Sequence, residues 1–252
     1  MTFKRIIPCL DVRDGKVVKG VRFENLQEID EPTVLAGQYA EAGADELAFY
    51  DIAASVEGRG LYEETLRAVT TEVSISLIAG GGIRSLADIE RVLACGAKKV
   101  SLNTGVIDNP GLIAEAAARY GSGCIVLSVD MKRVGDAYHV FRSGGRVDTG
   151  IEGIGWITRC VQDGAGEVVL NAIDTDGVRD GYDIDMLRAV TEAVDAPVIA
   201  SGGAGSVDDF IRLFQQVPKV DAALAASVFH FGLVDIAVLK QALRNHGIKV
   251  RR

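Results

Sequence analysis

Two aspartates stand directly after apolar runs of the sequence: Asp11 follows KRIIPCL, and Asp130 follows CIVLSV. A carboxyl group can take up or release a proton, so two of them on opposite walls of one cavity suit a general base and a general acid. We predict that Asp11 and Asp130 are catalytic. The alternative is that both only accept hydrogen bonds from the turns that follow them, which is the role that strand-end residues such as Asp51, Asp174 and Asp176 often have.

Glycine-rich turns follow two further apolar runs, as GGG at residues 80–82 and as SGG at residues 201–203. Glycine has no side chain to keep an anion away, so backbone N–H groups in such a turn can bind a phosphate. The next apolar run in each case ends in NT (103–104) or AS (226–227), where a following helix can present further N–H groups. One such turn could serve the chain alone, whereas two at equivalent places predict two phosphate sites.

These residues need strands to position them, and eight short apolar runs precede them or alternate with them. The predicted strands are residues 5–10, 46–51, 75–79, 99–102, 124–129, 167–171, 198–200 and 222–225. Segments with a helical apolar period follow them, at residues 32–42, 61–73, 85–94, 110–120, 153–163, 183–194, 206–215 and 234–245. This alternation predicts an α/β protein in which residues 1–252 form a single (β/α)8 TIM barrel.

The two halves of the chain resemble each other. The segment LIAGGGIRSLADIERVL, which starts at Leu77, aligns with VIASGGAGSVDDFIRLF, which starts at Val198, and Glu46 pairs with Glu167 at the same separation. We therefore expect two similar half-barrels, with the third and fourth strands opposite the seventh and eighth. The two phosphate sites would then face each other, and a ligand that fills both would be elongated and phosphorylated at each end.

In a barrel of this kind the site is formed where the strands end. The residues predicted there to bind substrate or phosphate are Gly81, Gly82, Asn103, Thr104, Asn171, Asp176, Gly177, Ser201, Gly202, Gly203, Ala226 and Ser227. Two long connections, residues 12–31 and 131–150, follow the strands that end in Asp11 and Asp130. Long connections without regular structure tend to be functional or mobile.

Composition excludes several other classes of protein. Lys and Arg number 27 against 35 Asp and Glu, the net charge is −8, and no basic run exceeds a pair, so nucleic-acid binding is not expected. No apolar stretch approaches the roughly 18 residues of a membrane helix, and no signal peptide is evident, which predicts a cytoplasmic protein. The histidines and the four cysteines lack metal-ligand spacing, and no G-x-G-x-x-G motif follows the first strand. We therefore expect no metal and no cofactor.

Five motifs, taken in order, carry a family resemblance: KRIIPCLDVRDGKVVKG, AGGGIRS, VSLNT, ASGGAG and LAASVFHF. Together they resemble the cyclase subunits of imidazole glycerol phosphate synthase, a lyase of histidine biosynthesis. The resemblance implies that ammonia reacts with a phosphoribulosyl-formimino aminoimidazole-carboxamide ribonucleotide. The products would be imidazole glycerol phosphate and aminoimidazole-carboxamide ribonucleotide. It also implies that Asp11 and Asp130 are the acid and base and that Lys19 belongs to a mobile loop over the substrate.

The resemblance further implies a glutaminase partner at the N-terminal face of the barrel. An ammonia gate of Arg5, Glu46, Lys99 and Glu167 would lie there, and ammonia would travel along the barrel axis. We expect Ala48, Val100, Val169 and Ala223 to line that axis. Two other interpretations stay open: the isomerase of the preceding step of the same pathway, and a barrel that serves as a non-catalytic binding subunit.

Overall fold

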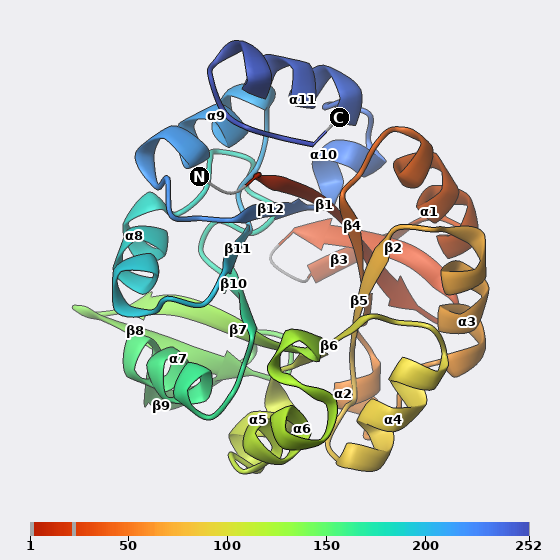
Figure 1. Cartoon of the computed structure of the whole chain (residues 1–252), viewed down its shortest axis with the longest axis vertical. Coiled ribbons are helices and arrows are strands. Elements are labelled where there is room, and N and C mark those ends of the chain that lie inside the picture. The colour runs from red at the N-terminus through yellow and green to blue at the C-terminus, as the bar shows by residue number, and fades with distance from the viewer. Residues whose placement is uncertain (1–2, 22–23, 252) are drawn as a thin grey trace.

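The computed structural model describes residues 3–21 and 24–251. Its centre is a closed barrel of parallel strands, visible end-on in Figure 1. Around the barrel the strands are β1 (Arg5–Arg13), β4 (Glu46–Asp51), β5 (Ser76–Gly80), β6 (Lys99–Leu102), β7 (Ile125–Val134), β10 (Glu167–Ala172), β11 (Val198–Ser201) and β12 (Ala222–Ala225). Pairing of β12 with β1 closes the ring, so the predicted (β/α)8 barrel is confirmed.

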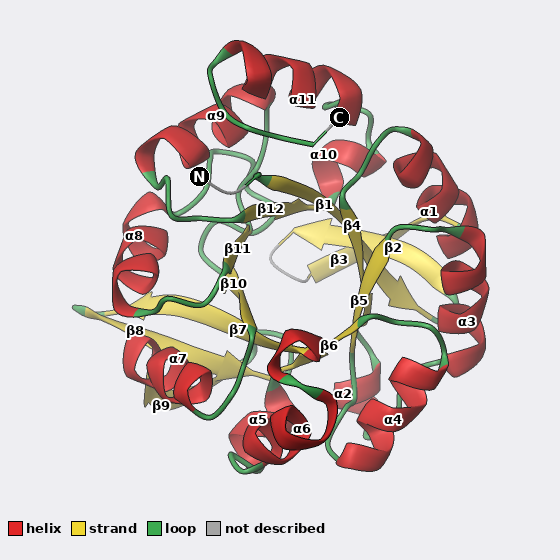
Figure 2. Cartoon of the chain, viewed as in Figure 1, coloured by secondary structure: helices red, strands yellow, loops and turns green. Residues whose placement is uncertain are grey.

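Helices cover the outside of the barrel, as Figure 2 shows. They are α1 (Pro32–Glu41), α3 (Glu63–Glu72), α4 (Leu86–Ala94), α6 (Leu112–Tyr120), α7 (Gly153–Gln162), α8 (Ile184–Ala193), α9 (Val207–Gln216) and α11 (Ile236–Asn245). Some helices start one or two residues later than predicted, and the residue directly before each of these helices is its N-cap. Asp183, for example, lies before α8 and accepts a hydrogen bond from Met186 N at 2.9 Å.

Short helices lie at several strand ends and were not separately predicted. They are α2 (Ala54–Glu57), α5 (Thr104–Asp108), α10 (Ser227–His230) and the 3-10 helix η1 (Ser122–Cys124). Both α5 and α10 start at the second residue of the NT and AS pairs. The expectation that a helical turn follows each pair is therefore confirmed.

The two long connections are not structureless, which corrects the expectation for residues 12–31 and 131–150. In the first, β2 (Lys16–Val21) and β3 (Glu24–Asp30) continue as a hairpin from β1; in the second, β8 (Ala137–Arg142) and β9 (Val147–Glu152) continue from β7. The turn after β1 has φ of 51° at Asp14 and 78° at Gly15, the left-handed geometry that tight hairpins need. Residues 22–23, within the first hairpin, lie outside the described part of the chain.

Alternation along each strand separates an inner from an outer core. Inside the barrel lie Ile7, Cys9, Ala48, Ile78, Val126, Val169, Ile199, Ala222, Leu224 and Ala226. Val100 and Ala223 belong instead to the larger cluster between barrel and helices, so the prediction that they line the axis is wrong. Their neighbours Lys99 and Ala222 face inward, and adjacent residues of a strand cannot share a face.

No helix among the described residues has the length and hydropathy needed to cross a bilayer.

Candidate active site

A cavity of about 280 Å³ opens at the carboxyl ends of the barrel strands. It brings together residues from both halves of the chain. Every residue predicted to be catalytic or to bind substrate lines it: Asp11, Lys19, Gly81, Gly82, Asn103, Thr104, Asp130, Asn171, Asp176, Gly177, Ser201, Gly202, Gly203, Ala226 and Ser227. The location of these residues in one cavity is thus observed, whereas their individual roles stay predictions.

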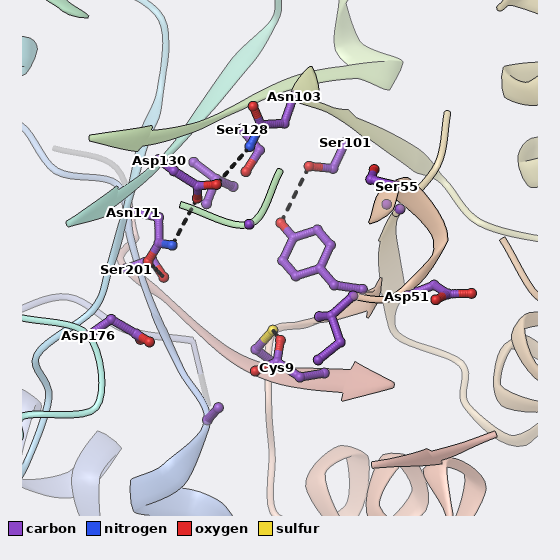
Figure 3. Close-up of a pocket in the computed structure, with 18 of the residues that line it drawn as sticks. Cys9, Asp51, Ser55, Ser101, Asn103, Ser128, Asp130, Asn171, Asp176 and Ser201 are labelled. Atoms are coloured by element: carbon purple, nitrogen blue, oxygen red, sulfur yellow. Dashed lines mark hydrogen bonds between the residues drawn. The ribbon is translucent and has the colours of Figure 1, made fainter. Parts of the chain in front are cut away.

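Asp130 lines this cavity and is almost fully buried. Asn103 and Asn171 each donate a side-chain hydrogen bond of 3.0 Å to its carboxyl oxygens, as Figure 3 shows. Burial raises the pKa of Asp130, and the two amide bonds offset part of that rise because they favour the charged form. A carboxyl group held in this way can deliver a proton to a substrate nitrogen or oxygen in the cavity.

Asp11 lies on the opposite wall, since β1 and β7 are separated by three strands in either direction around the barrel. Lys19 reaches into the cavity from β2 and places its Nζ 3.0 Å from Asp11 Oδ2. The Cys9 thiol donates to the other carboxylate oxygen at 3.4 Å. Asp11 is therefore held by a cation and lies beside the reaction space, which suits a base.

Lys19 also bridges toward Asp176, whose Oδ1 lies 3.9 Å from its Nζ. Burial disfavours the ammonium ion, but the two carboxylates outweigh this effect and raise the pKa of Lys19 overall. Burial raises the pKa of Asp176, which Lys19 partly opposes. The second oxygen of Asp176 is buried without a hydrogen-bond partner among the described residues, so it can accept a donor from a ligand.

The glycine turns fit tightly against neighbouring backbone. A Cβ at Gly81 would overlap the carbonyl oxygen of Asp51, and a Cβ at Gly203 would overlap that of Gly181. Gly81, Gly82, Gly202 and Gly203 all have positive φ, between 67° and 117°. Glycine is required at these positions, because φ is positive and any Cβ would overlap neighbouring backbone.

Asp51 has the structural role that strand-end aspartates often have, which is to accept hydrogen bonds from the loop that follows. Its carboxylate accepts hydrogen bonds from the backbone N–H groups of Ala54 at 3.0 Å and Tyr62 at 3.2 Å. The Arg59 guanidinium pairs with both carboxylate oxygens, at 2.5 and 3.0 Å. Asp174 is similar, since it accepts a bond from Arg133 N at 3.2 Å. Both residues organise loops beside the cavity.

At the other end of the barrel, the four residues predicted to form a gate make a closed ring of ion pairs. Arg5 contacts Glu46 at 2.7 Å and also pairs with Glu167. Lys99 lies 3.0 Å from Glu46 and 2.7 Å from Glu167. All four side chains are at most 19% exposed. The ring is observed, and its function as a gate stays a prediction.

Sequence reasoning missed several residues of the cavity. They include Ser101 and Ser128, and also Tyr50. The Ser101 hydroxyl donates a hydrogen bond of 3.4 Å to the Tyr50 hydroxyl. The strand alternation could have found them, since Ser101 and Ser128 stand two residues before Asn103 and Asp130. The hairpin residues Ser143, Gly144 and Arg146 also line the cavity. The sequence marked the long connection that contains them, but no signal singled out these three residues.

A (β/α)8 barrel with acidic and amide side chains gathered in a cavity at its strand ends has the architecture of a barrel enzyme. Comparison with known proteins agrees with this class. The chain belongs to the family of histidine biosynthesis proteins, whose family model matches residues 5–235.

Relatives match over the full length of both chains. Proteins from Streptococcus mutans (48% identical over 252 residues), Sulfolobus acidocaldarius (47% over 251) and Metallosphaera sedula (48% over 251) are each named imidazole glycerol phosphate synthase subunit HisF. The resemblance found in the sequence motifs, and with it the place of this enzyme in histidine biosynthesis, is thereby confirmed. The word subunit in these names also indicates that such proteins work in a complex.

Proposed function

We propose that this protein is the cyclase subunit that joins ammonia to a phosphoribulosyl-formimino aminoimidazole-carboxamide ribonucleotide. The products are imidazole glycerol phosphate, aminoimidazole-carboxamide ribonucleotide and one water, which is lost when the imidazole ring closes. The observation that carries the proposal is the opposition of Asp11 and Asp130 across a single cavity, with glycine turns on the two walls between them. A substrate with a phosphate at each end would span those turns and place its centre between the carboxyl groups.

The environments of the two aspartates support different roles. Attack by ammonia forms a C–N bond and leaves an excess proton on the nitrogen, which a carboxylate must remove. Departure of the second product requires a proton on its leaving nitrogen. Asp11, held beside the Lys19 cation, suits the base; Asp130, whose pKa is raised by burial, suits the acid.

The origin of ammonia supports the partner proposal. Ammonia is mostly protonated at neutral pH and is then no nucleophile, so a dry route from a source is an advantage. We propose a glutaminase partner at the N-terminal face, over the ring of Arg5, Glu46, Lys99 and Glu167. Between this ring and the cavity lie apolar interior side chains such as Ala48 and Val169, which would offer ammonia few competing hydrogen bonds.

The proposal is tested by turnover with ammonium salts and no partner. Asp11→Asn and Asp130→Asn should fold normally and lose about 10²–10⁴-fold in turnover, as is typical when a general acid or base is removed. The same preparations should be assayed with the substrate of the preceding isomerase step. Turnover of that substrate alone would favour the isomerase, and turnover of neither would favour a non-catalytic barrel. Near-normal rates in either variant would refute its assignment.

A further inference from the structure

The turn between β8 and β9 reaches the cavity from outside the barrel. Ser143, Gly144 and Gly145 have φ of 56°, 66° and 73°, three successive left-handed residues that reverse the chain sharply. Ser143, Gly144 and Arg146 line the cavity although β8 and β9 are not barrel strands. We call residues 143–146 the hairpin tip.

The hairpin tip is attached to one of the two glycine-turn walls and not to the other. Ser143 N–H donates a hydrogen bond of 3.3 Å to Thr104 Oγ1. Thr104 is the first residue of α5 and follows Asn103 at the end of β6, beside the wall that carries Gly81 and Gly82. The tip therefore lies over the phosphate site predicted at β5 and β6.

Ion pairing distinguishes Arg146 from the other cations that line the cavity. Lys19 is paired with Asp11 at 3.0 Å, and Arg13 lies 3.5 Å from Asp14. Within residues 3–21 and 24–251, Arg146 lines the cavity without an ion pair. A guanidinium group has five donors in a planar arrangement that matches phosphate oxygens. Its charge is thus available to a ligand without breaking a contact within the protein.

We propose that Arg146, carried by the hairpin tip, binds the substrate phosphate at the β5–β6 wall and closes that site. The inference rests on the proposed function, because it assumes a substrate with a phosphate at each end. Carboxylates outnumber cations in the cavity lining, so an entering dianion needs a positive group that is not already neutralised. Backbone N–H groups would fix the position of the phosphate, and Arg146 would supply net charge.

The test compares Arg146→Ala with Arg142→Ala in steady-state turnover with ammonium salt. Arg142 lies on the same hairpin, but its guanidinium contacts Asp108 at 3.2 Å and does not line the cavity. Arg146→Ala should raise KM about 10-fold or more with little change in kcat, the usual scale for a hydrogen bond to a charged group. Arg146→Lys should recover part of this loss, because it keeps the charge and loses the planar donors.

Inorganic phosphate as a competitive inhibitor gives a second measurement, because its inhibition constant reports phosphate binding separately from the chemical step. Its inhibition constant should rise in Arg146→Ala and not in Arg142→Ala, and the difference should shrink as ionic strength rises. If both alanine variants keep the wild-type KM and inhibition constant, or change equally, the role of Arg146 is refuted and the cyclase proposal stands. If the wild-type chain neither turns over the substrate nor binds phosphate, the proposed function fails, and the inference fails with it.

Discussion

Replacing Lys99 by methionine should separate the ring of ion pairs from the catalytic cavity. The change keeps most of the side-chain volume and removes a charge that lies 3.0 Å from Glu46 and 2.7 Å from Glu167. At an effective dielectric constant of about 20, each contact at roughly 3 Å represents an attraction of about 5 kcal/mol before desolvation. Desolvation cancels much of this sum, and removal of one partner from a buried pair typically costs about 3–5 kcal/mol.

The expected loss in this protein is smaller than the upper end of that range. Lys99 is 19% exposed, so some solvent can reach the two carboxylates, and Arg5 still contacts both of them. We expect the free energy of unfolding to fall by about 2–4 kcal/mol, measured by urea denaturation. Arg119→Met is the control, because Arg119 and Glu90 form a pair at 3.0 Å that is more than half exposed. It should cost at most about 1 kcal/mol.

The functional assay compares product formation from glutamine, in the presence of the glutaminase, with product formation from ammonium salt. Lys99→Met should impair the glutamine-dependent rate much more than the ammonium-dependent rate, because ammonia from solution can enter the cavity from the substrate side. An equal loss of both rates, at equal folded protein, would show that the ring supports the barrel and does not control ammonia. Failure of any glutaminase to bind would remove the partner proposal as well.

Three further predictions concern stability. Lys240→Met should lower the free energy of unfolding, measured in urea, by about 3–5 kcal/mol. The buried Asp45 carboxylate lies 2.9 Å from Lys240 and would lose its cation. Activity per folded molecule should not change. Burial lowers the pKa of His230 to about 4, so between pH 4 and 6.5 the folded state binds fewer protons than the unfolded state. The free energy of unfolding should therefore fall by about 3 kcal/mol as pH falls from 6.5 to 4. His230→Gln should lack this pH dependence. Gly82→Ala should lower the free energy of unfolding and raise KM, because φ is +67° and the new Cβ would overlap the carbonyl oxygen of Arg59. Gly15→Ala is the control: its φ is +78° and no atom of the described residues lies near the new Cβ, so it measures the backbone strain alone.

The barrel and its site residues were predictable from sequence because both follow from local patterns. Short apolar runs fix the strands, and the residue that ends each strand must lie at one rim. The error at Val100 and Ala223 has an equally local cause: their strand neighbours Lys99 and Ala222 face inward, so these two residues face the helices. The location of Arg146 could not be predicted in this way. It depends on how far a hairpin bends back over the barrel, which is decided by contacts such as that between Ser143 and Thr104.

Closure of the barrel by β1 and β12 has a consequence for how the protein is made. Arg5 pairs with Ala222 and Pro8 with Ala225, so the first strand lacks this partner until residues 222–225 have been synthesised. Until then β1 is an open sheet edge, and such edges promote association between chains. Contacts so distant along the chain also slow folding. We therefore expect β1, β4, β5 and β6 to be the part most dependent on chaperones during translation. Ribosome-bound chains that lack β12 should aggregate more readily than chains that include it.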